Sequence, residues 1–223
     1  MLKLFVFLGI LFDIYILLCY ILIMKGCVNM IPGNLLVACE RSQVVCTAFR
    51  AYGIEAYSCD ILPAYGNHPE WHIQGDAIEV AYSGYWSMMI AHPPCTYLSN
   101  AGNAWLKLPD GKLNLERLEK MSLARDFFLK LYNAPIPRVC LENPKPNGKA
   151  NLPPWSQAIQ PCYFGDPFTK YTLLWLRGLP GLMATCICQD VQSWTRIHSS
   201  PTVRSKTFEG VASAMAAQWR GFV

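Results

Sequence analysis

The sequence lacks the cysteine spacing of a structural metal site. Its ten cysteines include no C-x-x-C pair, and only Cys186 and Cys188 lie close together. This scatter supports neither a zinc ribbon nor a disulfide framework. We therefore expect no metal site and mostly reduced thiols, as in a cytoplasmic protein.

Charge of either sign is also scarce. Charged residues make up 15% of the chain, and the formal net charge is +4. This balance permits nucleic-acid binding but lacks the dense basic patch of a dedicated binder. Internal repeats and low-complexity segments are absent, and 223 residues that are 52% hydrophobic are ample for one domain with a full core. The composition thus excludes a disordered chain.

The first 29 residues differ from the rest. The segment Leu4 to Met24 is almost wholly apolar and long enough to span a bilayer as a helix. Asp13, in its middle, would be costly in lipid, and Met30 could itself begin a complete domain. Two interpretations stay open: residues 1–29 are a membrane anchor, or they reflect an over-long start. In either case we expect residues 30–223 to form one domain and a monomer, cytoplasmic unless the first segment holds it at a membrane.

From residue 34 the chain alternates strand-like and helix-like segments. This pattern is typical of an α/β fold, a largely parallel sheet with helices on both faces. The expected strands are Leu35–Cys39, Glu55–Cys59, His72–Gly75, Trp86–His92, Arg138–Leu141 and Tyr171–Leu176. Apolar spacing predicts helices from an N-cap at Ser42 to Tyr52, over Leu115–Leu131, and over Gly210–Trp219.

Two short segments, Pro93-Pro94-Cys95 and Glu142-Asn143-Pro144, each follow one of these buried strands. Because open α/β sheets bind ligands at the carboxyl ends of their strands, we expect the two segments to share one site. A cysteine can serve as nucleophile, and a glutamate as its acid partner. That pairing suits substitution at C5 of a pyrimidine ring, because C5 becomes nucleophilic only after a thiolate has added to C6.

The order of these segments resembles that of the C5-cytosine DNA methyltransferases, over roughly Asn34 to Trp219. Pro94-Cys95 matches the nucleophile turn of that family, and Glu142-Asn143 matches its Glu-Asn-Val motif. The resemblance implies a Rossmann-like methyltransferase fold, S-adenosylmethionine (SAM) as cofactor and DNA as partner. It also implies that Cys95 attacks C6 while Glu142 protonates or hydrogen-bonds N3 and the amino group. Pro94 would then orient the cysteine, and Asn143 would support the glutamate loop.

The resemblance also assigns residues to the cofactor. Asp60 follows the second strand, where the family binds the ribose, and Asp76 follows the third, where it contacts the adenine. The complete set of expected cofactor residues is Cys39, Glu40, Ser42, Asp60, Asp76, Pro93 and Gly210. Small compact enzymes of this type resemble those encoded by phages.

Two departures from the family pattern keep three hypotheses open. The first turn, Ala38 to Ser42, has no glycine, and only Arg177 to Val203 stands where the family inserts its DNA-recognition domain. The first hypothesis is cytosine methylation in DNA. The second is C5 methylation or hydroxymethylation of free pyrimidine nucleotides, since thymidylate synthases also have a Pro-Pro-Cys turn. The third is a non-catalytic nucleic-acid-binding module that kept the fold.

Overall fold

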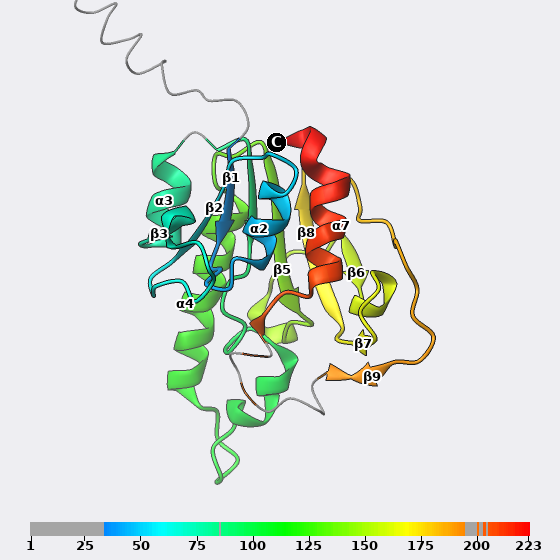
Figure 1. The fold of residues 1–223 in the computed structure, drawn as a ribbon. Coiled ribbons are helices and arrows are strands. Elements are labelled where there is room, and N and C mark those ends of the chain that lie inside the picture. The colour runs from blue at the N-terminus through cyan, green and yellow to red at the C-terminus, as the bar shows by residue number, and fades with distance from the viewer. Residues whose placement is uncertain (1–33, 85, 195–199, 201–202, 204) are drawn as a thin grey trace, which may run out of the picture. The chain divides into compact units, whose positions relative to one another are not determined.

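Seven strands form one sheet in the order β3-β2-β1-β4-β5-β8-β6, as the computed structural model shows (Figure 1). Pairing is parallel from β3 through β5, and β8 runs antiparallel to both β5 and β6. The strands are β1 Leu35–Ala38, β2 Ala56–Asp60, β3 His72–Gln74, β4 Met88–Ala91, β5 Arg138–Pro144, β6 Gln157–Ile159 and β8 Thr172–Arg177. A separate pair joins β7 Phe168–Thr169 to β9 Gln192–Ser193.

Four α-helices accompany the sheet within the described residues, which are 34–84, 86–194, 200, 203 and 205–223. They are α2 Val44–Arg50, α3 Ala77–Ser83, α4 Leu115–Tyr132 and α7 Glu209–Trp219. Short 3₁₀ turns lie at η1 Pro69–Trp71, η2 Asn100–Leu106, η3 Gly148–Ala150, η4 Pro161–Tyr163 and η5 Arg220–Phe222.

The N-terminal extension expected at residues 1–29 lies outside the described residues. Contacts group Gly33–Val223 into one compact unit. Of the helices in the described part, none combines the length and the apolar character that crossing a membrane requires.

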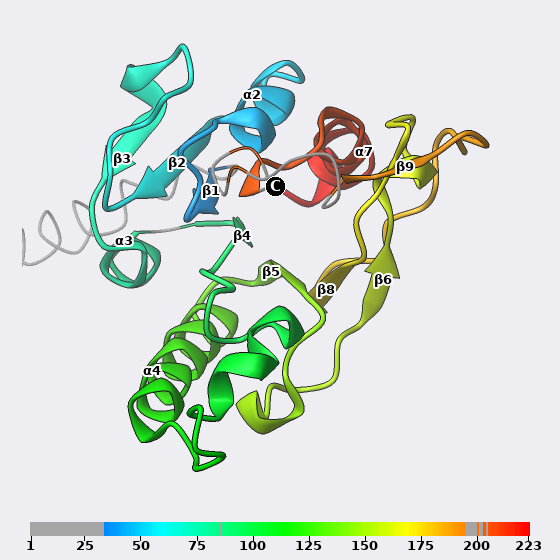
Figure 2. The same ribbon diagram turned by 90° about the horizontal axis from the view of Figure 1, so that it is seen from below.

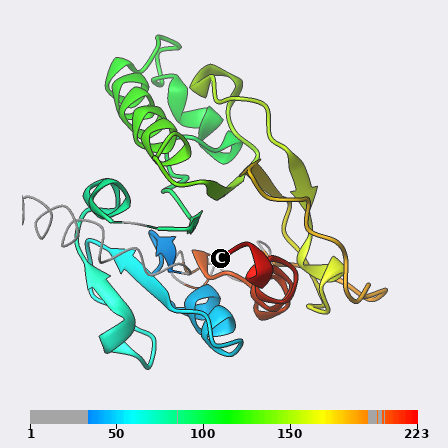
Figure 3. The same cartoon turned by 90° about the horizontal axis from the view of Figure 1, so that it is seen from above.

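Helices cover both faces of the sheet, because successive side chains of a strand point to opposite sides. Leu35 and Val37 of β1 belong to the core that packs α2 and α7. Leu36 and Ala38 belong to the opposite core, beneath α3 and α4. Figures 2 and 3 show these helix pairs on the two sides of the strands. The Rossmann-like α/β fold expected from the sequence is confirmed.

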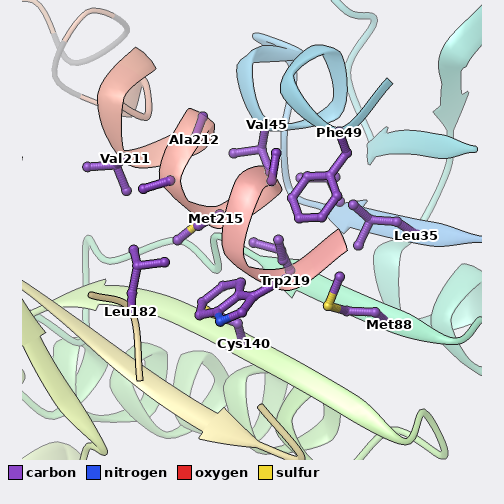
Figure 4. Close-up of a cluster of buried hydrophobic side chains, with 14 of the residues drawn as sticks. Leu35, Val45, Phe49, Met88, Cys140, Leu182, Val211, Ala212, Met215 and Trp219 are labelled. Carbon is purple, nitrogen blue, oxygen red and sulfur yellow. The ribbon is translucent and has the colours of Figure 1, made fainter. Parts of the chain in front are cut away.

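Trp219 anchors the closing helix α7 to the sheet. Its side chain is fully buried, and its indole N–H donates to the carbonyl of Pro180 across 3.2 Å. Figure 4 shows it among Phe49 of α2, Met88 of β4 and Cys140 of β5. Burying a side chain of this size contributes about 1.5–3 kcal/mol. This packing fixes the last turn of α7 relative to β5.

Most expected strands lie within two residues of the observed ones, but β5 is longer than predicted. It continues from Leu141 through Glu142, Asn143 and Pro144, because the antiparallel partner β8 pairs with these three residues after β4 has ended. Glu142 and Asn143 are therefore held by sheet pairing. The sequence analysis had placed them in a loop.

The prediction that Ser42 caps the first helix is wrong. Helix α2 begins at Val44, and Ser42 lies one residue before its N-cap, Gln43. The backbone N–H groups of Val45 and Cys46 donate instead to the two carboxylate oxygens of Glu40, at 2.8 and 3.3 Å. The Ser42 hydroxyl donates to the same carboxylate, at 3.3 Å.

Candidate active site

The Pro-Pro-Cys turn and the Glu-Asn pair lie at the carboxyl ends of the neighbouring strands β4 and β5. Parallel pairing places Ala91, the last residue of β4, opposite Leu141 of β5. The amide nitrogen Nδ2 of Asn143 donates to the Pro93 carbonyl across 2.8 Å, and both residues are buried. Cys95, two residues further, is exposed. The sheet thus brings the segments of the expected nucleophile, Cys95, and of the expected acid, Glu142, to the carboxyl ends of adjacent strands.

His92 is a member of this site that the sequence analysis missed. Its Nδ1 lies 3.2 Å from Oε2 of Glu142. The two side chains are only 10% and 18% exposed. Nε2 of His92 is buried and has no hydrogen-bond partner among the described residues. The one signal in the sequence was its position directly before Pro93.

Glu142 is stabilised as a carboxylate. Burial raises its pKa, but the hydrogen bond from His92 and the positive charges of Lys170 and His92 together outweigh burial and leave the pKa below its ordinary value. Lys170 and Thr172 also line the small hollow beside Glu142. Glu142 is therefore the hydrogen-bond acceptor of its contact with His92.

The turn after β1 has left-handed backbone although it contains no glycine. Cys39 has φ 59° and Gln43 has φ 60°, a region that non-glycine residues rarely adopt. The Gln43 side chain stabilises the turn, because its amide donates to the His68 carbonyl at 2.7 Å and accepts from the His68 N–H at 3.1 Å. The tertiary structure thus holds a left-handed turn at residues other than glycine.

Two of the expected cofactor residues converge on this turn. Burial raises the pKa of the Cys39 thiol, and the negative charges of Asp60 and Asp76 raise it further. Oδ1 of Asp60 accepts from the Leu62 N–H at 2.9 Å, and Oδ1 of Asp76 caps α3 by accepting from the Ile78 N–H at 2.7 Å. The carboxyl ends of β1, β2 and β3 therefore carry two carboxylates beside a left-handed turn.

Glu40 and Gly210 have structural contacts of their own. Glu40 is buried, and both its oxygens serve the first turn of α2. The Gly210 N–H donates to Oδ2 of Asp166 at 3.1 Å. A Cβ at Gly210 would collide with the Phe164 carbonyl oxygen, so only glycine allows this approach. Glu40 thus caps α2 and Gly210 packs α7 against Phe164, while their expected contacts with the cofactor stay predictions.

In the described part of the chain, no group of three or more His, Cys, Asp or Glu side chains is arranged to hold a metal ion. No protein-family model matches the sequence. No curated protein matches it either.

The solved structures that resemble the chain in three dimensions include two methyltransferases. One is described as a DNA modification methyltransferase encoded within an E. coli prophage, with 13% identity and a TM-score of 0.42 over 65% of this chain and 46% of that one. The other is the Dnmt2 methyltransferase of S. pombe, with 14% identity and a TM-score of 0.41 over 74% of this chain and 53% of that one. This chain thus spans about half the length of each. The strand order of the sheet shows the fold, and the contacts among His92, Pro93, Glu142 and Asn143 are the basis for an activity.

Proposed function

We propose that this protein transfers a methyl group from SAM to C5 of cytosine in DNA, with Cys95 as the nucleophile. The hydrogen bond from Asn143 to the Pro93 carbonyl is the observation that carries the proposal. It joins the loop that bears the thiol to the strand that bears the carboxylate. Two groups that must act on one pyrimidine ring are thereby held in a fixed relation.

The chemistry assigned to the chain's own residues is as follows. The Cys95 thiolate forms a bond to C6, the C5–C6 π electrons shift toward C4, and N3 gains the electron pair of the C4–N3 bond and takes a proton. Glu142 protonates or hydrogen-bonds N3 and the amino group of the ring. After methylation, water accepts the C5 proton, the electrons of the C5–H bond re-form the C5–C6 π bond, and the Cys95 thiolate leaves with the electrons of the C6–S bond, so that the ring is aromatic again. Pro94, with its fixed φ, limits the directions that Cys95 can take.

The turn after β1 fits the ribose and adenine of the cofactor. Asp60 and Asp76 each use Oδ1 for a backbone N–H, and Oδ2 accepts no hydrogen bond from the described residues. Carboxylate oxygens of this kind accept hydrogen bonds from ribose hydroxyls and from an adenine amino group. Cys39 and Pro93 complete the set that would hold SAM, which supplies the electrophilic methyl group when bound.

The test measures transfer of labelled methyl from SAM by the full chain. Substrates are double-stranded DNA, single-stranded DNA and free cytidine nucleotides, each offered to the wild type and to Cys95→Ala. Cys46→Ala is the matched control, because Cys46 is a buried thiol of helix α2 and is not among the expected site residues. We expect label in DNA cytosine from the wild type and the control, and none from Cys95→Ala.

Other results would redirect the assignment. Label in nucleotides but not in DNA would move the activity to free pyrimidines, which the short connection between β8 and α7 also suits. DNA binding that ignores both SAM and Cys95→Ala would support a non-catalytic module. Transfer that persists in Cys95→Ala would refute the cysteine mechanism.

A further inference from the structure

His92 is fixed at the junction of three strand ends. It follows β4 directly, and its backbone N–H donates to the Ala38 carbonyl of β1 across 3.0 Å. Its side chain crosses to β5, where Nδ1 meets Oε2 of Glu142 at 3.2 Å. The ring therefore has backbone support on one side and a carboxylate on the other.

The partner of Nδ1 determines which nitrogen of the ring carries hydrogen. An ionised carboxylate only accepts, so Nδ1 is the donor in this pair. Nε2 is buried without a hydrogen-bond partner among the described residues. A protonated imidazole would place one N–H on Glu142 and a second N–H in the buried pocket.

Several charged or titratable groups surround the pair. Glu40, at the end of β1, is near enough for the positive charge of His92 to lower its pKa, against the larger raising effect of burial. Lys170, just before β8, acts on Glu142 in the same direction as His92 does. Cys140 of β5 is buried, and burial raises its pKa, as does the charge of Glu142.

The proposed cytosine chemistry needs a proton that Glu142 alone does not hold. Its neighbours favour the carboxylate form, whereas N3 must gain a proton as the thiolate adds to C6. The group in contact with Glu142 that can carry an exchangeable proton near neutral pH is His92.

We propose that His92 is the proton reserve of Glu142, an inference that rests on the cytosine C5 chemistry proposed above. At the start the pair holds one transferable proton, on Nδ1 of an imidazolium beside a carboxylate. As the Cys95–C6 bond forms, this proton passes from Nδ1 through the Glu142 carboxyl group to N3. A neutral imidazole and a carboxylate remain. When the thiolate leaves C6, the N3 proton returns to the pair, so no external acid is consumed.

His92→Asn tests this role, because the asparagine amide can retain the N–H directed at Glu142 but has no proton to release. His92→Ala removes both the hydrogen bond and the proton. The control is His68→Gln, which alters a half-exposed histidine whose Nδ1 lies 3.0 Å from Glu70 and which contacts the turn after β1 through its backbone alone. We expect His92→Asn to lower kcat by about 100-fold, the usual range for loss of a proton donor. KM for DNA and SAM should stay unchanged, and one ionisation should disappear from the pH dependence of kcat.

A second measurement is independent of catalysis. The chain has four histidines, so the ring resonances can be assigned by substitution. If His92 and Glu142 share a proton, Glu142→Gln will shift the NMR titration of His92 to lower pH and leave that of His68 in place. A His92 titration that ignores Glu142→Gln would overturn the proposal.

The kinetic results separate this inference from the proposed function. A His92→Asn enzyme with wild-type kcat and pH profile, beside an active wild type, would overturn the proton role alone. Loss of activity only in His92→Ala would reduce His92 to a hydrogen-bond donor and also overturn it. A wild type that transfers no methyl group to any cytosine substrate would refute both.

Discussion

The side-chain amide of Asn143 donates a hydrogen bond to the carbonyl oxygen of Pro93 across 2.8 Å, and so joins the two segments that carry Cys95 and Glu142. The donor lies in strand β5, and the acceptor follows strand β4. The contact spans 50 residues of sequence.

We expect Asn143→Ala to destabilise the protein and to slow the reaction. The change leaves the buried Pro93 carbonyl without its donor, at a cost of about 1–3 kcal/mol in the free energy of unfolding. Because the loop is then free to shift, kcat should fall more than KM changes. Urea denaturation and steady-state kinetics measure the two effects. Asn133→Ala, at the exposed end of α4, is the control and should alter neither. Wild-type stability and kcat in Asn143→Ala would show that the tie is unimportant.

Asp60 and Asp76 should both contribute to SAM affinity, but for Asp76 two effects must be separated. Asp76→Ala removes the N-cap of α3 and should cost about 1 kcal/mol of stability. Asp76→Ser keeps a capping oxygen and removes the charge, so it should retain stability and still bind SAM less tightly.

Asp60→Ala should raise the Kd of SAM about 10-fold or more, the usual cost of a lost charged hydrogen bond. Calorimetry with the full chain measures each Kd, and unchanged values would remove SAM from this turn.

Glu40 and Glu142 should affect the pH dependence of stability in opposite directions. Burial raises the pKa of Glu40 above its ordinary 4.5. The contribution of Glu40 to the free energy of unfolding is therefore complete at low pH and is lost as the pH rises through the folded-state pKa. The pKa of Glu142 is lowered despite burial, so its contribution is present above 4.5 and is lost as pH falls.

Urea denaturation at a series of pH values checks this pair of signs. Glu40→Gln should reduce the decline in the free energy of unfolding as the pH rises above 4.5, the ordinary pKa of a glutamate. Glu142→Gln should reduce the decline as the pH falls below it. The same slope change in both variants would contradict the assignment.

Gly210→Ala should destabilise the protein. The added methyl group would meet the Phe164 carbonyl oxygen and, at 2.6 Å, Oδ2 of Asp166. Overpacking of this kind costs about 1–3 kcal/mol, and the melting temperature should fall accordingly. Gly148→Ala is the control, because its Cβ would meet nothing within 4 Å. If Gly210→Ala melts like the wild type but loses SAM binding, Gly210 is a cofactor residue after all, as the family resemblance implies.

The sequence by itself determined the architecture and the position of the candidate site residues along the strands. Alternating apolar runs and helical spacing are local properties, so the central strands and the helices α4 and α7 could be located from them. The sequence also predicted that Cys95 and Glu142 each follow a strand of a largely parallel sheet, and the structure shows that these two strands are neighbours. In a parallel sheet, strands joined by helical crossovers end at the same edge, and this brings the two residues together.

Only the tertiary structure decided which partner each polar group meets. The antiparallel strand β8 extends β5 through Glu142 and Asn143, and the contact of His92 with Glu142 joins residues 50 apart. The left-handed turn at Cys39 and Gln43 is equally non-local, because the Gln43 side chain is held by His68. Such contacts depend on strand register and on the packing of distant segments. They have no periodic signature in the sequence, and for this reason a helix cap at Glu40 was mistaken for one at Ser42.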